Sequence, residues 1–477
     1  MTDTRMKALS LLPACLLLGA CAGAPAPLDS GIVTPPAWQY GAGDTRRGEL
    51  QRWWTRFGAG ELDGLVQRAL DNSQDLAAAI ARVDQARASA VIAGAPLLPE
   101  VNAQLGVTRE KLLHGAGYSS IDASEDDKAV DTFSAGLSAS YEVDFWGGRR
   151  AAYRSALQSL KASEYDRATV ELTLVAGVAD AYLQVLALRE QQRIARLNLE
   201  NAEQVLGLVR SRSEAGSATE LEVAQQSGLV AAQQRQLPLL QQQERDAQVT
   251  LATLIGEPLP ALKLGGQPFD SVRWPQVGAG LPSELLTRRP DVARAEAQLA
   301  AAQADVQVAR AAMLPSLTLT ANLSSGANHA SDLLRTSYYD LGANLLAPIF
   351  NHGRLGAERD RRLALQRELL ENYRKAILGA FADTERSLNG IDGIDRQLHW
   401  QQQELEQAQR AFELSDSRYQ AGAETLITVL DTQRTLYQAQ DAAVQLRLAR
   451  LQAAVGLFKA LGGGWDAAVA PLARNAP

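Results

Sequence analysis

The amino-acid sequence predicts a membrane protein of the α+β class, in which long helices continue a barrel built from short strands. Three observations lead to this class: two helical stretches too long for one globule, four alternating stretches of membrane-spanning length, and a plan that occurs twice along the chain. The chain has 477 residues and a formal net charge of −7. Because it is acidic and shows no basic patch among aromatic residues, a nucleic-acid partner is disfavoured.

The first residues are typical of a secretory signal. Arg5 and Lys7 precede an apolar run over residues 8–18, which is too short to cross a bilayer as a helix but suits a signal-peptide core. Residues 18–21 read Leu-Gly-Ala-Cys and resemble the bacterial lipobox, in which the cysteine is lipidated and becomes the first mature residue. An ordinary signal peptide with an incidental cysteine is the alternative.

We therefore predict a lipoprotein signal peptide over residues 1–20 and a lipidated tether over residues 21–60. The lipid, diacylglycerol plus palmitate, would be attached to Cys21, and we expect no other cofactor. Ala22 follows this cysteine, where an aspartate would favour the inner membrane in the same resemblance, and this indicates the outer membrane. Once Cys15 leaves with the signal, the mature chain would have no free cysteine and no disulfide.

The first repeat, residues 61–256, combines helices with two strands. A helical pattern runs from Glu61 to Ala93, and prolines end it. The apolar period then becomes two, which predicts strands over residues 100–109 and 133–145 on either side of a polar loop.

A long helix is predicted over residues 147–212, which hold no proline. At 1.5 Å per residue it would span roughly 100 Å, so it must lie along other helices of comparable length. A turn at Gly216 leads into a return helix over residues 219–255. The first helix and this return helix, placed end to end beside the long one, would give a cylinder of helices.

The same plan recurs in residues 282–462, after a proline- and glycine-rich connector over residues 257–281. The turn motif around Gly216 returns about 206 residues later around Gly422, which indicates an internal duplication. The second copy predicts, in order, strands over 316–325 and 338–349, a long helix over 353–419, a return helix over 425–461 and a C-terminal tail over 463–477.

Four strands of roughly ten residues, each with one apolar face, have the length of membrane-spanning barrel strands. A soluble sandwich whose apolar face is a core is the alternative. Serine, threonine, asparagine and glycine dominate the other face and suit a wet lumen. Because the smallest membrane barrels use about eight strands, four cannot close one, and the barrel must be shared between protomers. The residues alone leave the number of protomers open.

Several short motifs carry a resemblance to a known family. They are Trp53-Trp54 with Phe57, Tyr-Glu-Val-Asp-Phe-Trp-Gly over 141–147, Pro348-Ile349-Phe350 before Gly353-Arg354, and Ala-Leu-Gly-Gly-Gly-Trp over 460–465. With the doubled plan, they make the chain resemble the TolC-like outer-membrane efflux proteins, in the lipoprotein branch typified by OprM and NodT. The resemblance implies a homotrimer, with a twelve-stranded barrel in the outer-membrane lipid and a twelve-helix barrel in the periplasm.

The resemblance also places a closed periplasmic gate at the second turn and the helix that follows it. The gate residues would be Ile427, Asp431 and Arg434, with a gate tyrosine at Tyr419. Three copies of Asp431 beside three copies of Ile427 would form an acidic constriction next to an apolar one. A solvated pair of Asp431 and Arg434, and a plain core tyrosine, are the alternatives. Thr428 stands where some relatives carry a second acid, so the acidic ring would be single.

A periplasmic membrane-fusion adaptor would bind in the grooves beside both turns, according to the same resemblance. The alternative is that the glycines only permit the turns and that the aliphatic residues only pack. The adaptor-binding candidates are Arg212, Gly216, Thr219, Leu221, Val223, Arg418, Gly422, Thr425 and Val429.

We interpret the chain as the exit duct of a tripartite efflux pump that exports drugs or other small toxic compounds. Its further partner would be an inner-membrane pump of the resistance-nodulation-division type. Enzyme activity and a metal site are not expected, because the four histidines lack metal-ligand spacing and no nucleophile motif is present. The alternatives are the exit duct of a type I protein-secretion system and a structural or adhesive coiled-coil lipoprotein without a pore.

Overall fold

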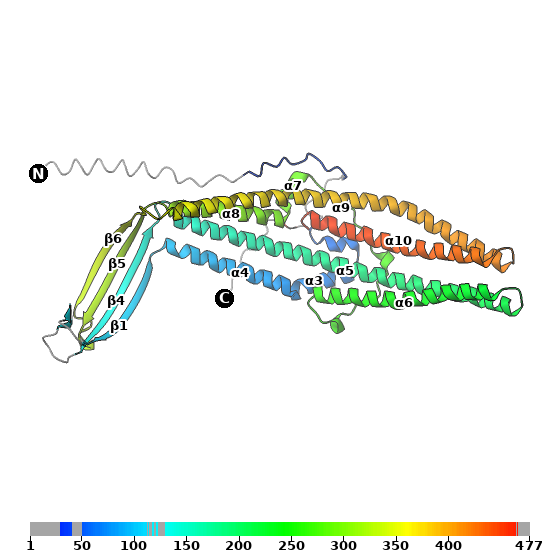
Figure 1. Ribbon diagram of the computed structural model, residues 1–477, viewed down its shortest axis with the longest axis horizontal. Helices are drawn as coiled ribbons and strands as arrows, with labels where there is room; N and C mark the ends of the chain where they lie inside the picture. Colours follow the sequence, from blue (N-terminus) through cyan, green and yellow to red (C-terminus); the bar gives the residue numbers. More distant parts are fainter. Residues whose placement is uncertain are drawn as a thin grey trace. The chain divides into compact units, whose positions relative to one another are not determined.

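The computed structural model describes residues 29–40, 50–111, 113, 117–118, 121–122, 129–463 and 465. The chain divides into two compact units, the first with Asp84–Ala162 and Ala295–Tyr373, the second with Gly31–Val83, Ser163–Arg294 and Arg374–Pro477. Figure 1 traces the elements along the chain. The predicted signal peptide, its lipidation site at Cys21, and the tail beyond Trp465 lie outside the described residues.

The first unit holds a four-stranded antiparallel sheet in the order β1-β4-β5-β6 (Figure 1). Its strands are β1 (Glu100–Glu110), β4 (Val130–Val143), β5 (Ser316–Ala327) and β6 (Ser337–Leu346). A two-stranded sheet of β2 (Gly117–Tyr118) and β3 (Ile121–Asp122) lies in the predicted polar loop. The two repeats meet where β4 pairs with β5, for example at Leu137 and Leu323.

The last strand is shorter than the predicted range of 338–349, because β6 ends at Leu346. Pro348 has no N–H to donate to a strand ladder, which accounts for the early end. The other three strands begin within three residues of the prediction, and β4 starts earlier, at Val130, where it pairs with Glu110.

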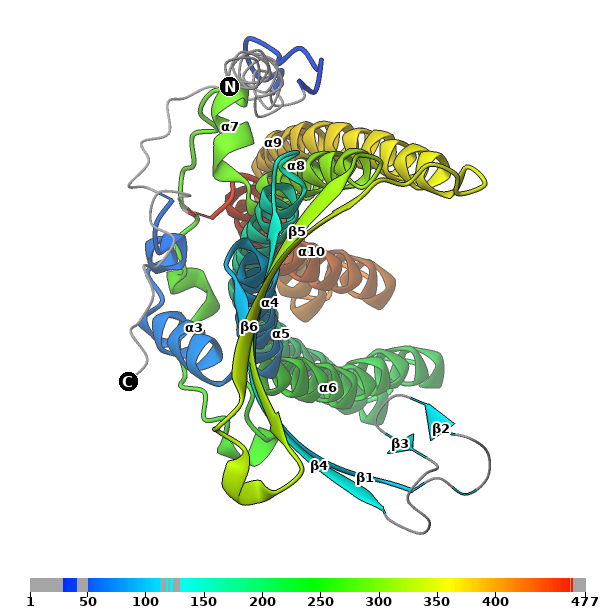
Figure 2. The same ribbon diagram turned by 90° about the vertical axis from the view of Figure 1, so that its left-hand side faces the viewer.

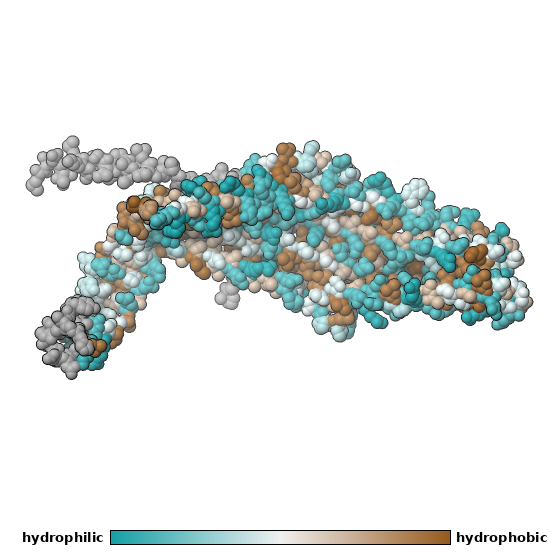
Figure 3. Space-filling view, in the orientation of Figure 1, coloured by the Kyte–Doolittle hydropathy of each residue, from teal (hydrophilic) through white to brown (hydrophobic). Residues whose placement is uncertain are grey.

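One face of this sheet is apolar and uncovered by protein. Leu105 and Leu341 are 84% and 75% exposed. Figure 3 shows a hydrophobic group where the strands meet the helices. Phe145, Ile349 and Phe350 belong to this level of the chain and are exposed. An apolar face bordered by aromatic residues is the surface that barrel strands present to lipid.

Four helices adjoin the strands along the chain, two ahead of a strand and two behind one. They are α4 (Gln74–Gly94), α8 (Pro290–Ala311) and the first parts of α5 (Gly148–Glu214) and α9 (Arg354–Gln420). The Asp144 carboxylate accepts the main-chain N–H groups of Arg149 and Arg150 at 2.9 Å each, and this caps α5. A carboxylate at a helix N-terminus pairs otherwise unsatisfied donors and opposes the positive end of the helix dipole.

The predicted helix from Glu61 to Ala93 is not continuous. It consists of α3 (Gly60–Asn72) and α4, which are separated at Ser73. Ser73 has an extended backbone, and its hydroxyl accepts the Leu76 N–H at 3.4 Å, as a helix-capping serine does. The apolar period carries through this serine, so the prediction of one helix was wrong at the point where a cap interrupts the backbone.

The long helices are close to their predicted bounds, and α5 and α9 contain 67 residues each. An 18-residue window of α5 is apolar enough to cross a membrane, but 56% of it is buried inside the protein. Its apolar character is therefore explained by core packing. The return helices are α6 (Glu220–Leu254) and α10 (Leu426–Ala460), and the short helix α7 (Pro282–Arg288) precedes α8.

An aromatic cluster explains the tryptophan motif of the sequence. Trp53 is fully buried and stacks on Phe458 of α10 with ring centroids 5.0 Å apart, and Phe57 packs edge-on at 6.1 Å. Aromatic pairs of this kind add roughly 0.5–1.5 kcal/mol each beyond the area that they bury. The short helix that carries the motif is thereby fixed to the end of α10.

Part of the predicted tether is held against the protein. The Trp38 indole N–H donates to the Gly280 carbonyl at 2.9 Å, and its ring contacts Phe381 of α9 at 6.1 Å. The Gln39 N–H donates to Glu385 of the same helix at 2.9 Å. This part of the predicted tether is therefore fixed to α9 and to the segment that precedes α7.

Candidate functional site

The candidate site is the pair of turns that join each long helix to its return helix, and both turns belong to the second unit. In the first turn the Ser217 N–H donates to the Arg212 carbonyl at 2.8 Å, and in the second the Ala423 N–H donates to the Arg418 carbonyl at 2.8 Å. This six-to-one bond is the Schellman ending of a helix. The duplication seen in the sequence therefore builds the same turn twice.

Each turn requires glycine for its backbone. Gly216 and Gly422 both have φ of +76°, in the left-handed region that side chains disfavour. Among the described residues, no atom beyond the immediate chain neighbours lies within 4 Å of the place where a Cβ would stand at either position. Backbone conformation, and not lack of space, therefore explains both glycines.

The two equivalent arginines make different contacts. Arg212 donates to the carbonyl oxygens of Tyr419 and Gln420 at 2.8 and 2.9 Å, and so links the first turn to the end of α9. Arg418 stays within its own turn, 3.6 Å from the Glu424 carboxylate. Ser213 occupies the position equivalent to Tyr419 in the first repeat, so an aromatic partner exists on one side only.

Below this link lies an apolar cluster drawn from all four helices. Tyr419 is 3% exposed, and burial raises the pKa of its phenol, which the nearby Arg212 opposes. Its hydroxyl has no hydrogen-bond partner among the described residues. Val223 packs against the cluster, whose buried members are Val205, Val209, Leu229, Tyr419, Leu426, Val429 and Leu430.

Tyr419 therefore lies in the core of each protomer, as the alternative of a core tyrosine expects. The adaptor candidate Val429 needs correction, because it is fully buried and has no side-chain surface to offer a partner. Val223 is half-buried because it packs against the same cluster.

Other predicted residues lie on the surface. Leu221 and Ile427 hold equivalent places in the two repeats and are 66% and 51% exposed. Asp431 and Arg434 approach to 3.8 Å between carboxylate and guanidinium, with both side chains more than half exposed. An exposed pair at this helical spacing contributes only about 0.3–0.5 kcal/mol. It is thus available to interact with other chains.

The starts of the return helices differ although their threonines are equivalent. Thr219 and Glu222 form a complete capping box, in which the Glu222 N–H donates to the Thr219 hydroxyl at 3.3 Å and the Thr219 N–H donates to the Glu222 carboxylate at 2.7 Å. Thr425 makes no such cap. Thr428 takes the place of Glu222, and its hydroxyl donates instead to Glu424 at 3.1 Å.

Sequence reasoning missed Glu424 and the contact between Arg212 and Tyr419. The Thr425 N–H and the Thr428 hydroxyl hold the pKa of the Glu424 carboxyl below its usual range. The capping box was visible as Thr-Glu-Leu-Glu over 219–222. No local pattern marks the link between the turns, because its partners lie about 207 residues apart.

The comparison with known proteins matches both repeats of the chain. A family model described as outer membrane efflux protein matches residues 65–257 and 281–463. The chain is 75% identical over 471 residues to the pyoverdine export outer membrane protein OpmQ of Pseudomonas aeruginosa strain PAO1, covering 98% of this chain and 99% of the relative. It is 56% identical over 465 residues to the protein of the same name from Pseudomonas putida strain KT2440, covering 97% and 99%.

Solved structures share the fold along nearly the whole chain. The outer-membrane channel OprN aligns with a TM-score of 0.85 and 26% identity, covering 93% of this chain and 100% of that one. CusC aligns with a TM-score of 0.83 and 27% identity, with the same coverage.

These similarities exclude the soluble sandwich and the scaffold without a pore. The fold is that of the trimeric TolC-like ducts, in which three copies complete a twelve-stranded barrel in the outer membrane and the helical body lies in the periplasm. Such a duct is the transport component through which an efflux system opens to the outside. By its matched repeats, its relatives and its structure, the chain belongs to the outer membrane efflux protein family.

Proposed function

We propose that this efflux duct exports a siderophore of the pyoverdine class. The observation that carries the proposal is the relative named for pyoverdine export, which is 75% identical over 98% of this chain. The toluene efflux pump outer membrane protein TtgF of Pseudomonas putida is only 34% identical. The relatives named for pyoverdine export are thus more similar to this chain than the relative named for toluene efflux. This supports a siderophore as cargo over the wider range of drugs and toxic compounds expected from the sequence.

The polar face of the sheet is compatible with a hydrophilic cargo. Asn102, Ser138, Asn322 and Asp340 form one row across the four strands. The Asn322 amide donates to the Asp340 carboxylate at 2.9 Å. Hydroxyl and amide groups exchange hydrogen bonds with a passing polar compound and with water, whereas they offer nothing to an apolar one.

The two turns supply the gate in this proposal. Arg212 holds the end of α9 to the first turn, and Ile427 and Asp431 of three protomers narrow the aperture beside it. Support comes from the exposure of Ile427 and Asp431 in one chain and from the cross-turn bonds of Arg212. Arg434 would compensate the repulsion between the three carboxylates.

The adaptor surface is the exposed part of the same region. Leu221 offers an apolar contact, Thr219 and Thr425 hold equivalent places in the two repeats, and Arg418 adds an exposed charge in the second turn. Gly216 and Gly422 contribute by shaping the turns, and Val429 by packing under them.

The partners would be this adaptor and an inner-membrane pump, which we propose to be of the resistance-nodulation-division type on the sequence resemblance. Such a pump depends on the proton gradient. A protonophore applied to cells with maintained ATP should then stop export at once. Export that continues under those conditions would replace this pump class by an ATP-driven one.

Lipidation of Cys21 is also part of the proposal. Labelled palmitate should appear in the mature protein and be absent from Cys21→Ser. Incorporation into the variant would show that the cysteine is incidental.

Deletion of the gene, with and without complementation, tests the cargo. Pyoverdine fluorescence in the medium should fall severalfold and rise in the periplasm of the deletion strain, and the complementing gene should restore both. Unchanged pyoverdine secretion combined with lost solvent tolerance would contradict the siderophore proposal while leaving the duct itself intact.

A further inference from the structure

Each long helix and its return helix share an apolar core. We call α5 with α6 the first pair and α9 with α10 the second pair; Figure 2 shows them as neighbours. Clusters of Leu188, Ala195 and Leu240, and of Ala202, Leu206 and Val230, belong to the first pair. A cluster of Ala408, Leu436, Tyr437 and Ala439 belongs to the second pair. At this level of the helices, apolar packing therefore holds each pair together from within.

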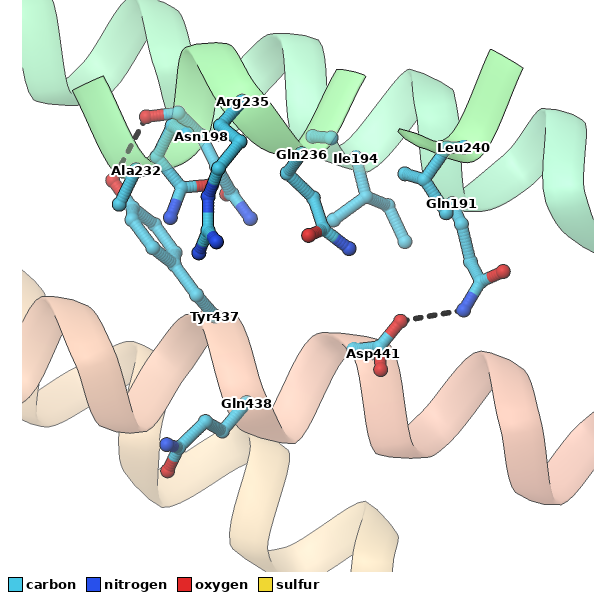
Figure 4. Close-up of a pocket in the computed structure, with 12 residues that line it drawn as sticks. Gln191, Ile194, Asn198, Ala232, Arg235, Gln236, Leu240, Tyr437, Gln438 and Asp441 are labelled. Atoms are coloured by element: carbon cyan, nitrogen blue, oxygen red, sulfur yellow. Dashed lines mark hydrogen bonds between the residues drawn. The ribbon is translucent and has the colours of Figure 1, made fainter. Parts of the chain in front are cut away.

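Two hydrogen bonds join the two pairs at the same level. The Tyr437 hydroxyl of α10 donates to the main-chain oxygen of Asn198 in α5 at 2.9 Å. The Gln191 amide of α5 donates to the Asp441 carboxylate of α10 (Figure 4). The apolar cluster around Tyr419 joins the pairs again closer to the turns. We call the region of these two hydrogen bonds the polar seam; it lies farther from the turns than that cluster.

A cavity of about 270 Å³ opens along this seam (Figure 4). It lies between α5, α6 and α10. Apolar side chains such as Ile194 and Leu240 share its wall with polar ones, namely Gln191, Asn198, Gln236, Arg235, Gln438 and Asp441. A second cavity of about 430 Å³ follows along the same three helices and shares Gln191. The seam is therefore hollow over several helical turns.

One buried group on the cavity wall lacks a partner. Asn198 is 4% exposed, and its side-chain oxygen has no hydrogen bond among the described residues. Buried polar atoms are nearly always paired with protein or with ordered water, because an unpaired one loses the hydration that it had in the unfolded chain. Gln233, Gln236 and Arg235 of α6 line the same cavity and carry N–H donors.

We propose that this cavity is a hydrated site between the two helix pairs, filled with water in the resting duct and accessible to small polar molecules. Its volume exceeds the ~30 Å³ that one water takes up in the liquid several times over, and its walls supply the two to four polar partners that a buried water needs. Asp441 receives amide donors from Gln191 and Gln445, and its negative charge shares the cavity wall with the positive charge of Arg235. This proposal involves neither of the two turns and does not depend on which compound the duct exports.

A cysteine introduced into the cavity tests this proposal on the full-length trimer. The sequence contains only Cys15 and Cys21, so a new thiol in the helical body is readily identified by mass spectrometry. Ala195 belongs to one apolar cluster of the first pair but also lines the cavity and is 5% exposed, while Ala202, in the other cluster, does not line it and is fully buried. Ala195→Cys and Ala202→Cys are therefore matched variants.

We expect 2-aminoethyl methanethiosulfonate, a small cationic reagent, to modify the Ala195→Cys thiol at least a hundredfold faster than the Ala202→Cys thiol. Equal protection of both thiols would overturn the proposal. So would reaction of the Ala195→Cys thiol with an apolar maleimide alone, which is the behaviour of a dry cavity.

Filling the cavity provides a second test in the same protein. Ala232 of α6 lines the cavity, and leucine at this position would occupy part of its volume. Added to Ala195→Cys, Ala232→Leu should slow the cationic reagent at least tenfold. An unchanged rate would mean that the reagent reaches the thiol by another route, and the hydrated site would be rejected.

Discussion

The guanidinium carbon of Arg212 lies 4.4 Å from the centre of the Tyr419 ring, while the same side chain donates to the main-chain oxygen of Tyr419 at 2.8 Å. One residue of the first repeat thus contacts both the ring and the backbone at the end of α9. Arg418, its counterpart in the second repeat, contacts the Glu424 carboxylate and the Ala423 carbonyl of its own turn instead. The two turns therefore share one backbone conformation, but their equivalent arginines make different contacts.

Replacing Arg212 by alanine should loosen the second turn. Hydrogen bonds from a charged donor contribute about 1.5–3 kcal/mol, and a cation–π contact at an exposed site about 0.5–1. Since Arg212 is partly exposed, a loss of about 2 kcal/mol is expected, and this would raise the open fraction roughly thirtyfold at 1.4 kcal/mol per factor of ten. Conductance of purified trimers in planar bilayers measures it. Arg418→Ala is the matched control and should change conductance little; equal effects of the two variants would contradict the role of the cross-turn link.

Asp431→Asn should reduce the preference of the channel for cations. One Asp431 pairs only loosely with Arg434, at 3.8 Å, so folding stability should change by less than about 0.5 kcal/mol. Three such charges around an aperture act together on a passing ion. The reversal potential in a salt gradient should move toward zero, and Glu413→Gln on the exposed face of α9 serves as control. An unchanged reversal potential would mean that Asp431 does not set the cation preference of the channel.

Thr219→Ala and Thr425→Ala should differ although the residues are equivalent. Thr219 belongs to a complete capping box, and loss of such a cap costs about 1 kcal/mol, whereas Thr425 forms no side-chain cap. Hydrogen exchange of the amides in the first turn of α6 should accelerate about fivefold in Thr219→Ala. In Thr425→Ala the first turn of α10 should keep its rate. The same acceleration in both variants would mean that the caps do not control these helix starts.

Asp180→Asn should stabilise the protein at neutral pH. Burial raises the pKa of the Asp180 carboxyl from 3.8 to about 6, an effect that Lys459 opposes, and one of its oxygens has no hydrogen-bond partner in the described part of the chain. Because the folded state holds the proton more tightly, the contribution of Asp180 is fully favourable below about pH 3.8 and is lost as pH rises through about 6. The difference corresponds to at most about 3 kcal/mol.

Thermal unfolding of the trimer at pH 5 and pH 7.5 checks this. Asp180→Asn should raise the unfolding temperature more at pH 7.5 than at pH 5. Asp166→Asn is the opposite control, since Asp166 pairs with Arg294 at 2.7 Å and with Arg82 at 3.4 Å, and the protein should be destabilised by the change. A pH-independent gain in Asp180→Asn would argue against a buried carboxylate as its cause.

Much of the fold could be predicted because its signals are local and repeated. Alternation with period two fixed which residues share a face of β1, β4 and β5, and the absence of proline marked α5 and α9 within two residues of their ends. The break at Ser73 was missed, since the apolar period continues through it while one backbone angle changes. The early end of β6 was missed for the same kind of reason, because alternation continues past the last paired residue.

The candidate site was predicted only in part. The turns follow from their repeated glycines, and Leu221, Ile427 and Asp431, which the family resemblance singled out, are exposed in the structure. The burial of Val429 and Tyr419 does not, because it depends on which helices meet below the turns. The link between Arg212 and Tyr419 joins residues of different repeats and leaves no periodic trace.

By itself the sequence determined the class of the protein, its doubled plan, its membrane-length strands and its two glycine turns, because each rests on composition and period over a short stretch of chain. Only the tertiary structure decided that Arg212 crosses to the other turn, that Thr425 lacks its cap, and that a cavity opens between α5, α6 and α10. These features depend on side chains brought together from distant positions. Which of these side chains contact one another depends on how the helices pack, and no single stretch of the sequence encodes that packing.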